Sequence, residues 1–286
     1  MDGEHSAEPN RQLETADLVE VMRRIHGLDI SCYDTAFLLK AIERRWQTAT
    51  AETSAAYLER VAQDRAEAEA LVDSLQIHFS EFFRDPLTFA LVEQRILPGL
   101  VAASEASDRR ELRIWSAGCS TGQEAYSLAI LLVELSGARE RPISFRLFAT
   151  DRCEAQIAQA RAGAFPASAM HNVRLGHLQR WFRQQGSIYV AAPELRERVD
   201  FSVHDLLDER SICPPASIFG DFDLVVCCNV LLYYQAEDRQ RILDKLQRCL
   251  VGGGYLVTGE AERDPVQNTA GFRAMATPAS VFQKGR

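Results

Sequence analysis

The chain has 286 residues, 47% of them hydrophobic, and a formal net charge of −8 at pH 7. This length suits two modest domains, and the acidic balance argues against general binding of nucleic acid. No apolar run approaches membrane-spanning length, and the polar N-terminal stretch lacks the apolar core of a secretory signal, so we expect no membrane insertion.

The seven cysteines are irregularly spaced, and no C-x-x-C pair occurs. An odd number at such spacing disfavours both a disulfide framework and a zinc site. We therefore expect reduced thiols, no bound metal and a cytoplasmic protein.

The first third of the chain shows helical periodicity and no convincing strand. Residues 1–12 are predicted to form a flexible tail, and residues 13–102 a small all-helical domain. One of its helices begins at Pro86, and the pair Pro98-Gly99 is predicted to end it.

A second helix of this domain, within residues 33–50, separates apolar from basic side chains. Its apolar residues share one side, and Lys40, Arg44 and Arg45 lie on the other. Basic residues in this arrangement usually form a solvated helix face.

Strands and helices alternate after a polar linker at 103–111. The predicted strands are 112–117, 143–150, 222–227 and 254–259, and the predicted helices are 123–136, 154–162 and 237–250. This alternation indicates a parallel sheet covered on both faces. Two short segments at the end of the chain suit a closing antiparallel hairpin, and residues 164–200 form an insert of a helix and small strands. The second domain is therefore predicted to span 103–286.

The stretch "RIWSAGCSTGQEAYSLAILL", residues 113–132, predicts a strand, a loop of small residues and a helix. The spacing Gly118-x-x-x-Gly122 matches neither a P-loop nor the dinucleotide fingerprint, which disfavours a nicotinamide oxidoreductase. The next strand ends at Asp151, which suits a ribose diol or caps the following helix. A ribose site without a phosphate site suggests S-adenosylmethionine.

Four segments occur in the order HFSEFFRDPLTF, WSAGCSTGQEAYSLA, FATDRCEAQIAQARAG and FDLVVCCNVLLYY. Together they resemble the CheR-type methyltransferases, which esterify glutamates on bacterial chemotaxis receptors. The resemblance runs from about residue 20 to the C-terminus. It implies an α/β class I S-adenosylmethionine-dependent methyltransferase fold, a Rossmann-like doubly wound sheet with a closing antiparallel hairpin, preceded by the helical domain and carrying a small β insert.

The resemblance also implies cofactor contacts at specific positions. Glu124 takes the methionine ammonium, Asp151 binds the ribose, and Asp205 and Leu206 flank the adenine. The other positions implied for cofactor contact are His78, Ser80, Arg84, Ala117, Gly118, Cys228 and Asn229.

Two residues are implied as catalytic: Arg84, near the methyl group, and Tyr233, beside it. A glutamate side chain is ionised near neutral pH, so it needs alignment and exclusion of water rather than a general base. A guanidinium such as that of Arg84 holds a carboxylate in fixed geometry. Tyr233 donates a hydrogen bond or shapes the methyl pocket.

The chain departs from the family pattern at several of these positions. Cys228 stands where the family typically has Arg before Asn229, and His78 stands where Asn is usual. "GEAE" at 259–262 replaces a common Gly-His-Ser-Glu. These departures keep a second function open, a catalytically weakened sensor or adaptor that binds S-adenosylmethionine. A methyltransferase for RNA or a small molecule is disfavoured by the acidic charge and by the helical domain.

The resemblance further implies a partner, the cytoplasmic helical domain of methyl-accepting chemotaxis receptors. Lys40, Arg44 and Arg45 are the implied docking residues for its acidic, glutamate-bearing helices. The insert resembles a subdomain that binds a pentapeptide tether in some members, but its short connection "RQQGSIYV" favours a tether-independent enzyme. We expect a monomer that binds no nucleic acid.

Overall fold

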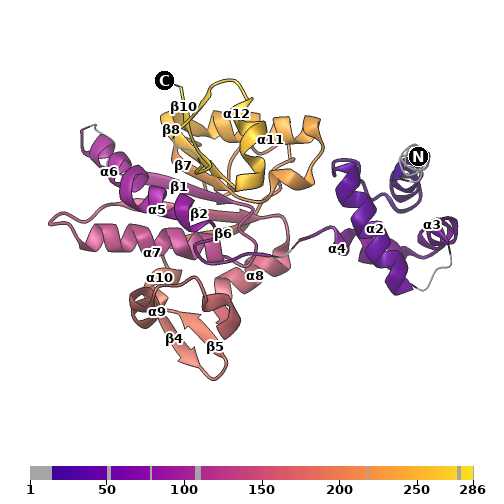
Figure 1. Cartoon of the computed structure of the whole chain (residues 1–286), viewed down its shortest axis with the longest axis horizontal. Coiled ribbons are helices and arrows are strands. Elements are labelled where there is room, and N and C mark those ends of the chain that lie inside the picture. The colour runs from indigo at the N-terminus through magenta and orange to yellow at the C-terminus, as the bar shows by residue number, and fades with distance from the viewer. Residues whose placement is uncertain are drawn as a thin grey trace, which may run out of the picture. The chain divides into compact units, whose positions relative to one another are not determined.

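The chain forms two compact units, a helical unit and a sheet unit (Figure 1). The computed structural model describes residues 15–49, 53–77, 79–106, 111–217, 219–275 and 278–285. The helical unit holds the described residues up to Ile77 together with Leu232–Arg239, and the sheet unit holds the others. The predicted tail at 1–12 lies outside the described residues.

The boundary between the units lies at 77/78 and not at the predicted position 102/103. A continuous helical stretch, residues 86–105, carries Phe89, Ile96 and Leu100 into the same apolar core as the first strand of the sheet. These helices belong to the sheet unit because their buried apolar side chains pack against side chains of the sheet.

The same stretch continues through Pro98, where the sequence predicted an end. Helix α5 (Pro86–Leu91) passes into a π-helical segment, η2 (Val92–Ile96), and then into α6 (Leu97–Glu105). Proline lacks an N–H donor and crowds the carbonyl one turn earlier, and a π turn relieves that crowding. The predicted stop is therefore wrong.

Among the described residues before Ile77, four helical segments pack around one core. Residues 15–21 are helical and continue into η1 (Met22–His26), which ends at Gly27 with a φ of 70°. The α-helices that follow are α2 (Thr35–Ala49), α3 (Ser54–Gln63) and α4 (Arg65–Ser74). Their buried side chains include Leu18, Met22, Leu38, Ala41, Tyr57, Val61 and Leu71.

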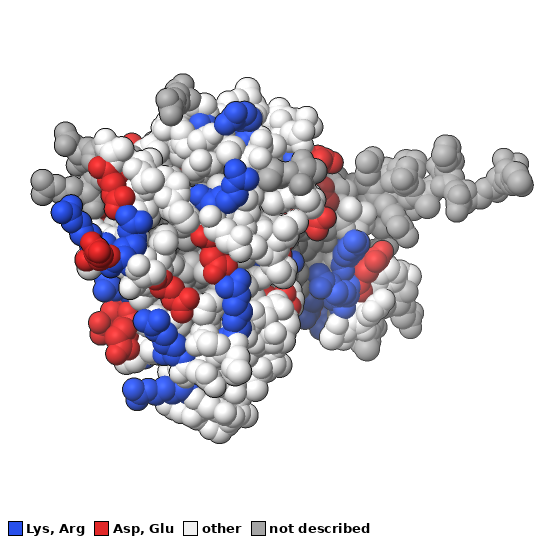
Figure 2. Space-filling model, turned by 60° about the vertical axis from the view of Figure 1, so that its left-hand side comes forward, with Lys and Arg blue, Asp and Glu red and all other residues white. Residues whose placement is uncertain are grey.

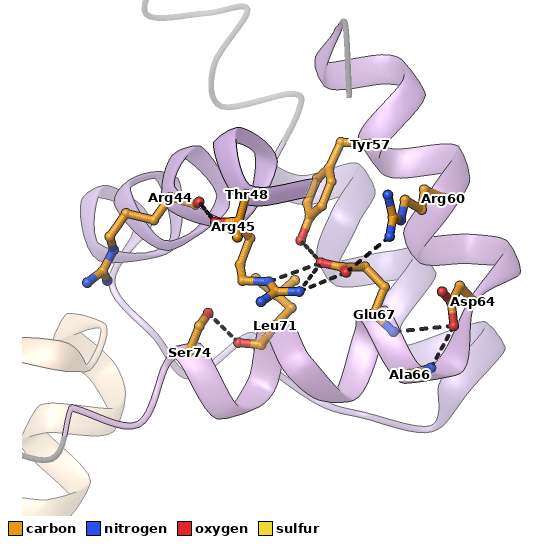
Figure 3. Close-up of polar contacts among 10 residues, drawn as sticks. All are labelled: Arg44, Arg45, Thr48, Tyr57, Arg60, Asp64, Ala66, Glu67, Leu71 and Ser74. Carbon is orange, nitrogen blue, oxygen red and sulfur yellow. Dashed lines mark hydrogen bonds and ion pairs between the residues drawn. The ribbon is translucent and has the colours of Figure 1, made fainter. Parts of the chain in front are cut away.

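An ion pair between Arg45 and Glu67 lies inside this unit (Figure 3). Arg45 Nη2 lies 2.8 Å from Glu67 Oε2, and Arg45 Nε lies 3.1 Å from Glu67 Oε1. The Glu67 side chain is only 5% exposed, and the Tyr57 hydroxyl donates a hydrogen bond of 3.0 Å to it. The pair therefore fastens α2 to α4.

The prediction that Arg45 shares a solvated face with Lys40 and Arg44 is wrong. Arg45 follows the buried Ala41 by one helical turn, so its side chain lies at the border of the apolar face and reaches Glu67. Lys40 and Arg44 are exposed, as expected.

The sheet unit is built on seven strands in the order β6-β2-β1-β7-β8-β10-β9. The first five are parallel, and β10 pairs antiparallel with both β8 and β9. The strands are β1 (Leu112–Ala117), β2 (Phe145–Asp151), β6 (Val199–Val203), β7 (Phe222–Cys227), β8 (Leu250–Thr258), β9 (Phe272–Ala274) and β10 (Val281–Lys284). The α/β class with its closing antiparallel hairpin is thus confirmed.

Both faces of the sheet are covered. In β1, Ile114 joins the core shared with the helical stretch 86–105, while Trp115 packs on the opposite side against Phe222 at a ring distance of 5.5 Å. The helices between the strands are α7 (Gln123–Gly137), α8 (Glu154–Ala162), α11 (Ala236–Cys249) and α12 (Arg263–Gln267). Among the described residues, no helix is long and apolar enough to cross a membrane.

Strand β6 belongs to the main sheet, although its first two residues, 199 and 200, were predicted to belong to the insert. It pairs parallel to β2, with Val199 opposite Leu147. Val199 and Phe201 are buried while Asp200 is exposed, the alternation of an edge strand. Such alternation does not reveal which sheet a strand will join.

The insert forms its own antiparallel sheet in the order β3-β5-β4. Its elements are β3 (Ala164–Pro166), α9 (Leu175–Trp181), β4 (Phe182–Gln185), β5 (Ile188–Ala191) and α10 (Pro193–Arg196). Figure 1 shows β4, β5, α9 and α10 grouped beside α8. On the face drawn in Figure 2, basic and acidic side chains are interspersed.

Replacing Arg45 by Ala is expected to destabilise the helical unit. Among the described residues, removing Arg45 leaves the buried Glu67 carboxylate with only Arg60, 4.0 Å away, and the Tyr57 hydroxyl, so we expect a cost of about 1–3 kcal/mol. Urea unfolding followed by circular dichroism should show this loss for Arg45→Ala. The neighbouring variant Arg44→Ala, which removes an exposed side chain, should unfold like the unaltered chain. Equal effects of the two substitutions would contradict the structural role of Arg45.

Candidate functional site

Four neighbouring parallel strands end at one edge of the sheet, and the predicted site residues lie there. Gly118 follows β1, Asp151 ends β2, Asp205 lies beyond β6, and Cys228 and Asn229 follow β7. In open parallel sheets the ligand crevice lies outside the carboxyl ends of the strands. This edge is therefore the candidate site.

The loop after β1 depends on glycine. Gly118, Ser120 and Gly122 have φ angles of 81°, 49° and 94°. The Gly118 N–H donates to the Thr150 carbonyl at 2.8 Å, and a Cβ on Gly118 would lie 2.4 Å from Val230 Cγ2. Position 118 therefore excludes any side chain, because both its backbone angle and its packing require glycine.

The Asp151 carboxylate ties the glycine loop to the next helix. Its Oδ2 accepts the Ser120 N–H at 2.9 Å, and its Oδ1 accepts the Cys153 N–H, also at 2.9 Å, in the turn that opens α8. A carboxylate has about four acceptor sites, so two remain for other donors. The N-cap of α8 is Cys153 and no side chain caps this helix, so the helix-capping interpretation of Asp151 is wrong. The two contacts leave acceptor sites for hydroxyl donors.

Glu124, in the first turn of α7, carries a half-buried carboxyl group. The Ser116 hydroxyl donates to its Oε1 at 2.7 Å, and the Cys228 thiol also hydrogen-bonds to it. Burial raises the pKa of Glu124 from 4.5 to about 7. The Ser116 and Cys228 hydrogen bonds and the charge of Arg84 oppose this rise in pKa, and the charge of Glu262 adds to it. Glu124 is thus poised to become ionised when a cation arrives.

Glu262 organises the segment after β7, a role that the sequence did not predict. It is 1% exposed and accepts backbone N–H groups of Asn229 (2.8 Å), Leu231 (2.7 Å) and Gly259 (2.7 Å). Asn229 has a φ of 60°, a left-handed conformation that these bonds help to hold. The available signal was the Gly-x-x-Glu spacing directly after a strand, which marks an acid close to a strand end.

Arg84 lies in a strained loop. Its neighbours Phe83 and Asp85 have φ angles of 49° and 59°, which cost non-glycine residues about 1 kcal/mol or more each. Asp85 caps α5 by accepting the Thr88 N–H at 3.3 Å. The Arg84 guanidinium lies 5.1 Å from the centre of the Phe79 ring, and its charge lowers the pKa of Glu124. The Arg84 charge therefore acts on Glu124, although no ion pair joins these two described side chains.

The remaining expected cofactor positions differ in burial. Ala117, the last residue of β1, and Leu206 are buried, and Ser80 is half-buried. Asp205 is exposed, and its Oδ1 accepts the backbone N–H two residues further along at 2.8 Å. His78 lies outside the described residues.

Tyr233 belongs to the helical unit together with Lys40, Arg44 and Arg45. Its ring lies 4.9 Å from that of Phe37. The neighbouring Tyr234 is buried and stacks on Tyr33 at 5.8 Å. These contacts identify Tyr234 as the core residue of the pair, and the catalytic place of Tyr233 stays a prediction.

Comparison with curated proteins finds several relatives. A protein of Rhodobacter capsulatus, called an uncharacterized 104.1 kDa protein, is 33% identical over 245 residues, which are 86% of this chain and 25% of that protein. The chain thus spans a quarter of this relative. Chemotaxis protein methyltransferase 1 of Pseudomonas aeruginosa is 36% identical over 68% of this chain and 69% of its own length. The putative methyltransferase Cher3 of Pseudomonas putida is 31% identical over 98% and 99% of the two chains.

Residues 78–281 match the family described as CheR methyltransferase, SAM binding domain. This match begins where the sheet unit begins and includes the glycine loop, Glu124, Asp151, Asn229 and the insert. The chain therefore belongs to the CheR methyltransferase family, and its sheet unit is the domain that binds S-adenosylmethionine.

Proposed function

We propose that this chain transfers a methyl group from S-adenosylmethionine to glutamate side chains of chemoreceptors. The observation that carries this proposal is a half-buried acid at the candidate edge of the sheet, Glu124, that is influenced by the charge of a cation, Arg84. The first suits an ammonium group, and the second suits an incoming carboxylate. Relatives named chemotaxis protein methyltransferase support the receptor as the partner.

The residues at this edge fit S-adenosylmethionine. Glu124 would hold its ammonium, the free acceptor sites of Asp151 would take the ribose hydroxyls, and the Gly118 backbone would lie against it. When bound, the cofactor supplies an electrophilic methyl group on a sulfonium. Asp205 and Leu206 would flank the adenine, and Ser80, Ala117, Cys228 and Asn229 would complete the contacts.

Arg84 orients the substrate carboxylate. A glutamate side chain is already ionised near neutral pH, so the enzyme must place one of its oxygens in line and exclude water. The guanidinium offers two parallel N–H donors, which fix a carboxylate more rigidly than a lysine ammonium does. The left-handed backbone at Phe83 and Asp85, on either side of Arg84, restricts the directions in which the Arg84 side chain can point. Tyr233 is proposed to shape the pocket of the transferred methyl.

Receptor docking is assigned to Lys40 and Arg44. Both are exposed on α2, and their charge complements glutamate-bearing receptor helices. Arg45, the third residue expected here, is engaged with Glu67 and is left out of this surface.

Cofactor affinity should depend on pH through Glu124. Below a pKa of about 7 its carboxyl is neutral, so binding an ammonium must first expel a proton. Calorimetric titration with S-adenosylmethionine should therefore show affinity about tenfold weaker at pH 6 than at pH 8. Glu124→Gln, which cannot ionise, should bind weakly with little change between these pH values. An unaltered chain with pH-independent affinity would contradict this role.

Methyl transfer should produce a base-labile ester. With radiolabelled S-adenosylmethionine and a receptor cytoplasmic domain, the transferred label should be released as methanol at alkaline pH. Arg84→Lys should lower kcat about 100-fold because it loses the two-donor geometry. Arg95→Lys, at an exposed position of η2, is the matched control and should keep full activity. Label that is stable to base, or no transfer at all, would overturn the proposed reaction.

Reversing the docking charges should weaken receptor binding alone. Lys40→Glu and Arg44→Glu are expected to raise the receptor KM several-fold at low salt, with less effect at high salt because exposed charges are screened. Cofactor affinity should not change. Arg24→Glu, at an exposed site on another helix of the same unit, is the control. A receptor KM equal to that of this control would exclude the surface.

A further inference from the structure

The loop that carries Arg84 is held from the side of the insert. Phe82 is fully buried, and its ring packs edge-on against Phe165 of β3 at 4.9 Å and Phe182 of β4 at 5.3 Å. Both partners belong to the small insert sheet. The residue two positions before Arg84 is therefore anchored in the insert and not in the main sheet.

The next residue is held from the same side. The Phe83 ring lies 5.4 Å from the ring of His177 in α9, and its N–H donates to Ser127 Oγ of α7 at 3.0 Å. His177 Nε2 in turn lies 3.0 Å from Glu134 Oε2 of α7. The backbone of Phe83 is thus clamped between the insert and α7.

The insert is itself fixed to the surrounding helices. The Trp181 indole N–H donates to Glu134 Oε1 at 3.1 Å, and Arg174 makes a two-point ion pair with Glu93 of η2 at 2.8 and 2.7 Å. Because these contacts join α9 to α7 and to the helical stretch after Arg84, the rings that receive Phe82 and Phe83 have a rigid support.

We propose that Phe165, Phe182 and His177 form a ring seat that positions Arg84, so that the insert takes part in turnover. A left-handed conformation at Phe83 and Asp85 persists only where the surroundings impose it. On the Phe83 side the ring seat contributes this constraint together with Phe89 of α5, whose ring lies 5.6 Å from that of Phe83. A change in the insert that moves these rings would also move Phe82 and Phe83, the two residues directly before Arg84. This inference rests on the role proposed above for Arg84.

The test uses substitutions that loosen the seat without leaving a large cavity. Phe182→Leu and Phe165→Leu keep an apolar side chain and remove the edge-on ring contacts. Ile188→Ala, at an exposed position of β5 in the same small sheet, is the matched control. Thermal unfolding followed by circular dichroism shows which variants are folded at the assay temperature. Two positions of the seat are tested, so the result does not depend on a single substitution.

The decisive readout is a double-variant cycle with Arg84→Ala, which separates positioning from general destabilisation. Phe182→Leu and Phe165→Leu should each lower kcat for receptor methylation about tenfold in the presence of Arg84, with the receptor KM unchanged. In the Arg84→Ala background the same substitutions should change kcat less than about twofold, and Ile188→Ala should have no effect in either background.

Equal losses with and without Arg84 would overturn the proposal, since the seat would then act on stability or on another group. Unchanged kcat in both seat variants would overturn it too. If Arg84→Ala alone kept full activity, the role proposed for Arg84 would fail, and the inference with it. The three failures give different patterns in the four variants of the cycle.

Discussion

The carboxylate of Glu262 links the backbone after β7 to the backbone after β8, at the edge of the sheet where the candidate site lies. It is almost fully buried, and it accepts backbone N–H groups from the ends of both β7 and β8. A buried carboxylate is costly unless donors surround it, and here the donors are main-chain groups whose positions it fixes. The left-handed turn at Asn229, and the packing of Val230 over Gly118, follow from that arrangement.

Acidic side chains recur along this edge, and each organises a loop. Asp151 ties the glycine loop to α8, and Glu124 binds Ser116 and Cys228. A site lined by such groups favours a ligand that brings positive charge, as S-adenosylmethionine does. Cys228, whose presence first suggested a sensor or adaptor, contributes a hydrogen bond to Glu124. The relatives that are named as methyltransferases do not favour that alternative.

Much of this organisation could be predicted from the sequence, because periodicity and strand-end residues are local signals. The strand, glycine loop and helix at 112–137 and the acid at the end of β2 were predicted correctly. The family was correctly identified from four ordered motifs, since no single loop is so specific.

The wrong predictions concern features that depend on contacts between residues far apart in the sequence. Strand β6 alternates like the insert strands, and only its pairing with β2 assigns it to the main sheet. Arg45 looked solvated because its partner, Glu67, is 22 residues away. The helical stretch 86–105 carried no local sign that its apolar face packs on β1 and not on the helical unit.

The central claim is that the glycine loop and its acids hold S-adenosylmethionine, and one calorimetric comparison tests it most directly. Gly118→Ala would place a methyl group against Val230 in a backbone conformation that only glycine adopts easily, while Gly137→Ala, at the end of α7, meets nothing within 4 Å. We predict that Gly118→Ala weakens S-adenosylmethionine binding at least about tenfold while Gly137→Ala binds like the unaltered chain. Equal affinity in all three proteins would contradict the assignment of the site.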